Sequence, residues 1–136
     1  MGVNHLKSNK SVEAVGSNTI WIYVKGIIAA YIFVLFIFLI MALVITYTSI
    51  SEALIPMFAS ITMIVSASIS GMYVGVKMKK KGWLNGAMEG LLYVLILIVM
   101  SWAFMKDFSM DRYALLKSLI GIVSGGIGGM IGVNLK

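Results

Sequence analysis

The stretch IIAAYIFVLFIFLIMALVI, residues 27–45, decides the fold class of this chain. It carries no charge, and it lies inside a run of 26 uncharged residues between Lys25 and Glu52. A transmembrane helix needs about 20 mostly apolar residues, because each residue adds about 1.5 Å across a hydrocarbon core of about 30 Å. The stretch therefore predicts a helix that spans a membrane.

The composition of all 136 residues agrees with a membrane protein. Hydrophobic residues make up 60% and charged residues 12%, whereas a soluble domain is about 45–50% apolar and about 25% charged. A soluble globular domain, a disordered chain and a soluble coiled coil are excluded, because too few charges are present to cover such a core. The eleven basic residues fit a membrane topology signal better than nucleic-acid binding.

Three further apolar runs follow the first. They extend from Ala53 to Val76, from Trp83 to Met105 and from Ser118 to Leu135. We therefore expect an all-α polytopic membrane protein made of two helical hairpins. A polar cytoplasmic tail (1–19) precedes a four-helix transmembrane domain (20–136), and the predicted spans are about 22–47, 53–76, 83–105 and 114–135.

The basic residues predict the orientation. Eight lysines lie in the N-terminal flank, in the loop between the second and third spans, and at the C-terminus, whereas the other side carries three Lys or Arg residues. Since Lys and Arg are enriched in cytoplasmic loops, both termini are expected in the cytoplasm. The basic loop on that side consists of Lys77, Lys79, Lys80 and Lys81.

The expected helix starts carry capping signals. Ser49 and Glu52 have the spacing of a capping box, in which each side chain satisfies a free backbone donor. Pro56 lies early in the second helix, where its missing N–H costs least. Asp111 is the expected N-cap of the fourth helix.

The two hairpins show signs of an internal repeat. Lys25-Gly26 and Lys81-Gly82 each precede a span, and a Gly-x-x-x-Gly-Val stretch closes the second span at Gly71 and the fourth at Gly128. Both hairpins would start on the same side, which predicts parallel repeats. The alternative is a chance match in a composition so rich in glycine and aliphatic residues.

Glycine is concentrated in the second half of the chain, although each glycine inside a helix costs about 1 kcal/mol relative to alanine. Small residues at a spacing of four form three ladders along single helix faces, and between helices in lipid such faces allow close backbone approach. We expect these glycines to pack the four helices together. A further interpretation is that a face of the fourth span also contacts another subunit. The expected packing residues are Gly71, Gly75, Gly82, Gly86, Gly90, Gly121, Gly125, Gly128, Gly129 and Gly132.

Glu89 is the acidic residue inside a predicted span. It lies about 9 Å along the helix from Trp83, so it can reach the inner headgroups and pair with the basic loop. Its neighbours Gly86 and Gly90 suggest instead that it faces another helix. A structural carboxylate and a proton or cation site are both open interpretations, and a structure distinguishes them by showing a sealed contact or a water-filled cavity.

The residues that metal sites and catalytic triads require are missing from the predicted spans. The chain has no cysteine, and its one histidine is His5 in the polar tail, which leaves no Cys-based or His-based metal site and no His-dependent triad. Asp107 and Asp111 lie in a predicted loop beside basic residues rather than within spans. We therefore expect no enzyme activity, no cofactor and no metal.

Three stretches resemble a known family. They are residues 45–56 (ITYTSISEALIP), residues 81–93 (KGWLNGAMEGLLY) and residues 125–135 (GGIGGMIGVNL). The chain resembles the YrzE-like family of small four-span bacterial membrane proteins of unknown function, over roughly residues 20–136. The resemblance implies four helices and a location in the bacterial plasma membrane. In that family the position of Glu89 is apolar, so this residue departs from the pattern.

Two functions are consistent with the sequence. The first is a non-enzymatic assembly or accessory component that binds the bilayer and either itself or a larger membrane complex through its glycine faces. The second is a small transporter or channel component in which Glu89 binds a proton or cation. A lipid-organising role is not distinguishable from the first function by sequence.

Overall fold

A computed structural model describes residues 2–107 and 109–135, with side chains from residue 16 onward. Four long helices follow one another: α1 (Gly2–Tyr47), α2 (Ile55–Met78), α3 (Gly82–Phe104) and α4 (Arg112–Asn134), with a short 3-10 helix η1 (Glu52–Leu54) before α2. All four contain segments long and apolar enough to cross a membrane. The expectation of an all-α protein with four transmembrane helices is confirmed.

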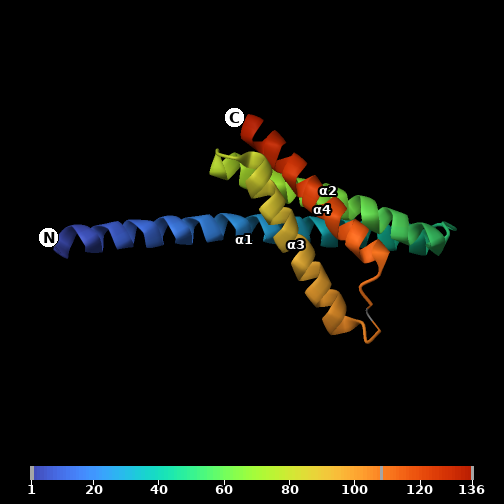
Figure 1. Cartoon of the computed structure of the whole chain (residues 1–136). Helices are drawn as coiled ribbons and strands as arrows, with labels where there is room; N and C mark the ends of the chain where they lie inside the picture. Colours follow the sequence, from blue (N-terminus) through green and yellow to red (C-terminus); the bar gives the residue numbers. More distant parts are fainter. Residues whose placement is uncertain (1, 108, 136) are drawn as a thin grey trace.

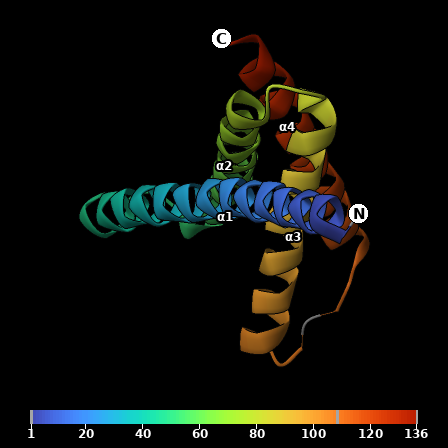
Figure 2. The same cartoon turned by 90° about the vertical axis from the view of Figure 1, so that its left-hand side faces the viewer.

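The helices pack as a group of three plus one (Figures 1 and 2). α4 packs closely on both α2 and α3, and α2 also packs on α3. α1 packs mainly on α2 and touches α3 at few positions. Its helix begins at Gly2, within the segment 1–19 that was expected to be a polar tail, and its N-terminal part extends past the other helices.

The helix ends follow local chemistry, with one correction. The N-cap beside Glu52 is Ser51, whose side chain accepts a hydrogen bond from the Ala53 N–H at 3.3 Å; the predicted capping box starting at Ser49 is wrong. Pro56 lies in the first turn of α2, as predicted. Asp111 is the N-cap of α4, also as predicted, and its Oδ1 accepts a hydrogen bond from the Arg112 N–H at 2.7 Å.

A tight turn joins α2 to α3. Lys79 and Lys81 both adopt left-handed backbone conformations, with φ of 55° and 44°. Such conformations are uncommon for residues with a side chain, and here they reverse the chain within three residues. The Asn85 side-chain amide donates to the Lys80 carbonyl at 2.7 Å, which ties the turn to the first residues of α3.

The two hairpins share one feature and differ in others. Gly26 of α1 packs against Ser70 and Val74 of α2, and Gly82 of α3 packs against Gly129 and Val133 of α4. The leading glycine of each hairpin thus meets the second helix of the same hairpin. α3, however, packs extensively on both α2 and α4, whereas α1 packs mainly on α2. The arrangement of the two hairpins is therefore not symmetric.

Most large apolar side chains point outward. Leucine, isoleucine and phenylalanine side chains on all four helices are exposed, whereas the buried hydrophobic side chains are Ala30, Ala67, Val74, Tyr93 and Val94. A surface of this kind is stable in lipid, where apolar side chains need no protein cover. The interior is therefore built from small residues.

Candidate functional site

The contact between α3 and α4 is made of backbone. A Cβ atom added at Gly125 would lie 2.6 Å from the Gly86 carbonyl oxygen and 2.8 Å from the Gly90 Cα. A Cβ atom added at Gly90 would likewise lie 2.8 Å from the Gly121 carbonyl oxygen. No side chain fits at these positions, because the atoms in the way belong to the opposite backbone.

The contact between α2 and α4 has the same character. Gly71 and Gly75 of α2 face the carbonyl groups of Gly125 and Gly129. A second face of α4 also meets α2. There Gly128 abuts the backbone of Ser68, Gly132 abuts that of Met72, and the Ser68 hydroxyl donates to the Ser124 carbonyl at 3.2 Å.

The structure therefore brings the ten sequence-predicted packing glycines together at the contacts among α2, α3 and α4. Both ladders of α4 are covered by helices of the same chain, and their glycines are buried. Neither ladder is open to a second subunit, so a subunit contact through these faces is not available in this arrangement.

Glu89 lies inside the helix bundle, with none of its surface exposed. Its Oε1 accepts a hydrogen bond from the Ser70 hydroxyl at 2.6 Å, across the α2–α3 contact. Its Oε2 has no hydrogen-bond partner among the described residues. Pairing with the basic loop was one expectation, and the structure contradicts it: among the described residues the carboxyl group is bound by Ser70 and makes no ion pair with Lys77 or Lys79–Lys81.

Gly26 of α1 closes this site. A Cβ atom at Gly26 would lie 2.6 Å from the Glu89 Oε1 and 3.3 Å from the Ser70 hydroxyl oxygen. α1 thus covers the carboxyl group with backbone. Glu89 lies in a sealed helix contact.

Two tyrosines of α1 extend this contact along α3. The Tyr23 hydroxyl donates to the Asn85 side-chain carbonyl at 3.2 Å, and the Tyr31 hydroxyl donates to the Tyr93 carbonyl at 3.5 Å. The rings of Tyr31 and Tyr93 lie 5.2 Å apart. Asn85, Glu89 and Tyr93 are spaced by four residues, so one polar face of α3 receives α1.

Ser70 and Gly26 were not predicted from the sequence as contacts of Glu89. A signal was present, because Thr62, Ser66 and Ser70 are spaced by four along α2 and all three are buried. Small polar residues at this spacing mark a helix face that donates hydrogen bonds to a neighbouring helix in lipid. The Ser66 hydroxyl has no hydrogen-bond partner within residues 2–107 and 109–135.

The basic loop lies at the end of the bundle where α2 turns into α3, near the C-terminus (Figure 1). Lys79, Lys80 and Lys81 are exposed. The Lys77 ammonium lies 5.9 Å from the centre of the Tyr73 ring. In the part of the chain that the structure describes, no group of three or more His, Cys, Asp or Glu residues could hold a metal ion.

Comparisons with known proteins match most of the chain. The family described as "Protein of unknown function (DUF3792)" matches residues 19–132. The chain is also 29% identical over 112 residues to "Uncharacterized membrane protein YrzE" of Bacillus subtilis (strain 168), which covers 82% of this chain and 73% of that protein. No solved structure matches.

Proposed function

The chain belongs to the DUF3792 family of membrane proteins, and from this premise we propose that it is a non-enzymatic assembly or accessory protein of the bacterial plasma membrane. In this proposal, glycine packing builds a rigid unit from α2, α3 and α4. The partner, either a second copy or a larger membrane complex, binds to the outward face of α1. Both termini lie in the cytoplasm, as the distribution of lysines favours.

The observation that carries this proposal is the isolation of α1. In the most hydrophobic 18-residue stretch of α1, 6% of the residues are buried inside the protein. The corresponding shares in α2, α3 and α4 are 22%, 22% and 33%. The face of α1 that points away from the other helices includes Ile32, Leu35 and Leu39, each more than 60% exposed. α1 is thus the helix with the most apolar surface free for lateral contact.

The chemistry of the chain supports a role without catalysis. Ser70 and the Oε1 of Glu89 form a contact between two helices, and most glycines of α2, α3 and α4 lie at backbone contacts. A lateral association needs only such a scaffold and a free apolar face. In lipid, association depends on packing rather than on hydrophobic exclusion.

The test is purification of the tagged chain from native membranes in mild detergent. We expect one partner in a fixed ratio with the wild-type chain and its loss from a variant that combines Leu35→Ala with Leu39→Ala. Leu116→Ala combined with Leu119→Ala is the matched control, because these α4 side chains are 56% and 59% exposed. Equal recovery of the partner from both variants would count against α1 as the binding helix.

A second function, a transporter or channel component, is favoured by one observation: the Oε2 of Glu89 is buried without a partner among the described residues. A carboxyl oxygen of this kind can bind a proton or a cation. The sealed position of Glu89 under Gly26 favours the assembly function instead. Proton and potassium flux into vesicles containing the wild-type chain or Glu89→Gln tests this: equal flux counts against transport.

A further inference from the structure

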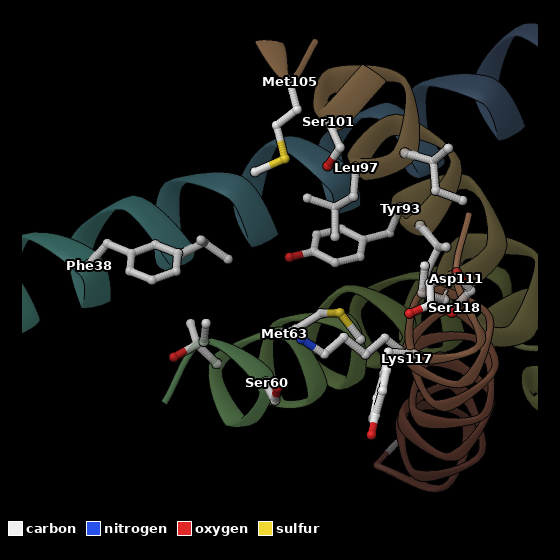
Figure 3. Close-up of a pocket in the computed structure, with 17 residues that line it drawn as sticks. Phe38, Ser60, Met63, Tyr93, Leu97, Ser101, Met105, Asp111, Lys117 and Ser118 are labelled. Carbon is white, nitrogen blue, oxygen red and sulfur yellow. Dashed lines mark hydrogen bonds between the residues drawn. The ribbon is translucent and has the colours of Figure 1, made fainter. Parts of the chain in front are cut away.

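A cavity of about 680 Å³ lies between α1, α2, α3 and α4, toward the end of the bundle that carries the connection 105–111. Figure 3 shows its walls: Phe38 comes from α1, Met63 from α2, Tyr93 and Leu97 from α3, and Lys117 from α4. Its volume is in the range of small-molecule sites, about 300–1,000 Å³. The wall is mostly apolar; its charged groups, Asp111 and Lys117, lie at the start of α4, and hydroxyl groups line it from α2, α3 and α4.

The cavity follows from where the glycines stop. α3 carries Gly82, Gly86 and Gly90 in its first half and no glycine after Gly90. At the next turn the Val94 side chain already meets α4, since a Cβ atom at Gly121 would lie 2.7 Å from the Val94 Cγ2. Beyond this point α3 and α4 diverge (Figures 1 and 2). The space between them is therefore a consequence of the sequence.

An apolar space of this size does not stay empty in a bilayer. Protein interiors have few voids larger than a water molecule, and water needs two to four polar partners, which most of this wall does not offer because it is mainly apolar. Lipid chains surround the protein and match an apolar wall. The occupant is thus expected to be at least partly a hydrocarbon chain.

Lys117 indicates the chemistry of the polar part of the ligand. Its side chain extends into the cavity toward Met63, away from Asp111 (Figure 3). Within the described ranges Lys117 makes no ion pair or hydrogen bond, and the Oδ1 of Asp111 is engaged with the Arg112 N–H. Lys117 is an exposed cation beside a mostly apolar wall, and it makes no ion pair with Asp111, which lines the same cavity. An anionic group of a ligand can bind the Lys117 ammonium there.

The depth of Lys117 fits a lipid headgroup. It lies five residues after Arg112, the first residue of α4, and therefore about 7.5 Å along the helix. The polar region of a bilayer occupies about 5–8 Å on each side of the hydrocarbon core. The Lys117 ammonium is thus placed near the level at which a phosphate meets its acyl chains.

We propose that this cavity binds one phospholipid molecule of the bilayer, with its phosphate on the Lys117 ammonium and an acyl chain along Phe38, Met63 and Leu97. This site is independent of the partner surface on α1. It gives the chain a lipid ligand in the leaflet at the 105–111 end. The lipid fills the space that the glycine contacts leave open.

The test is native mass spectrometry of the full chain released from nanodiscs that contain phosphatidylcholine and a minor share of phosphatidylglycerol. We expect the wild-type chain to retain one phosphatidylglycerol molecule, and Lys117→Gln to lower this retention about tenfold, which corresponds to the loss of one charge-assisted contact. Arg112→Gln removes the same charge at the same end of α4 but does not line the cavity, so its retention is expected to equal wild type. Diacylglycerol, which has the chains without the phosphate, is expected to be retained equally by wild type and Lys117→Gln.

Three results would overturn the proposal. They are unchanged retention in Lys117→Gln, an equal loss in Arg112→Gln, and a wild-type chain that carries a bound peptide or protein instead of lipid. Leu97→Trp adds bulk to the wall of the cavity and leaves Lys117 in place; it is expected to lower retention of phosphatidylglycerol as well. Helix content by circular dichroism confirms the fold of each variant, and Ser101→Phe, from the same wall, replaces Leu97→Trp if that variant loses helix.

Discussion

Adding one methyl group at Gly125 tests the backbone contact between α3 and α4 directly. The new Cβ in Gly125→Ala would lie 2.6 Å from the Gly86 carbonyl oxygen, 2.8 Å from the Gly90 Cα and 3.0 Å from the Gly90 nitrogen. All three atoms belong to the α3 backbone, so no side chain can rotate to make room. α3 and α4 have to move apart. The neighbouring Gly126→Ala is the matched control, because its Cβ would meet nothing closer than the Trp83 carbonyl oxygen at 3.5 Å.

The two substitutions have opposite expected effects. Overpacking costs about 1–3 kcal/mol, and alanine in place of a helical glycine contributes about 1 kcal/mol of helix propensity. For Gly125→Ala the two terms leave a net loss of about 0–2 kcal/mol. Because the clashing atoms are backbone and cannot rotate away, we expect the upper half of this range, a lowering of the free energy of unfolding by about 1–2 kcal/mol. Gly126→Ala gains the propensity without the clash, so we expect it to raise the free energy of unfolding by up to about 1 kcal/mol.

The assay is reversible unfolding by sodium dodecyl sulfate in mixed micelles, followed by far-ultraviolet circular dichroism. Both variants and the wild-type chain are compared at one protein concentration, because an association would otherwise add to the measured stability. The reasoning is refuted if Gly125→Ala is as stable as wild type. It is also refuted if Gly126→Ala is destabilised as much as Gly125→Ala.

Two further predictions concern single contacts, and a third concerns the topology. Ser70→Ala and Glu89→Ala are expected to show a coupling of about 0.6–1.7 kcal/mol in a double-mutant cycle of unfolding free energies, and a coupling near zero would contradict the hydrogen bond between them. Asp111→Ala is expected to lower the free energy of unfolding by about 1 kcal/mol through loss of the N-cap, whereas Asp107→Ala is the control, and equal effects would contradict the cap. Because the chain contains no cysteine, Lys80→Cys and Asp107→Cys report topology: a membrane-impermeant maleimide applied to intact cells is expected to label residue 107 and spare residue 80, and the reverse pattern would contradict cytoplasmic termini.

Local signals in the sequence predicted much of this architecture. The four apolar runs predicted four transmembrane helices, because span length depends on bilayer thickness alone. Pro56 and Asp111 marked helix starts, since their effects act within one turn. The spacing of Gly121, Gly125 and Gly129 placed them on one helix face.

The partners of each face were not predictable from local signals. Nothing in the spacing of Gly128 and Gly132 says whether they meet α2 of the same chain or another subunit, because a small face accepts any close backbone. The same holds for Glu89: its neighbours indicated a helix contact, but Ser70 and Gly26 were identified only by the packing of α1 and α2. The cavity depends on the divergence of α3 from α4, which needs the position of both helices.

Glycine contacts close α2, α3 and α4 within one chain, and we propose that α1 is left for association. Photo-crosslinking in native membranes tests this most directly, with a photoreactive residue at Leu35 or Leu39 of α1 and, for comparison, at Leu116 or Leu119 of α4. We expect a discrete crosslinked protein band from both α1 positions and none from the α4 positions. Crosslinks to protein from the α4 positions, with none from α1, would contradict this proposal.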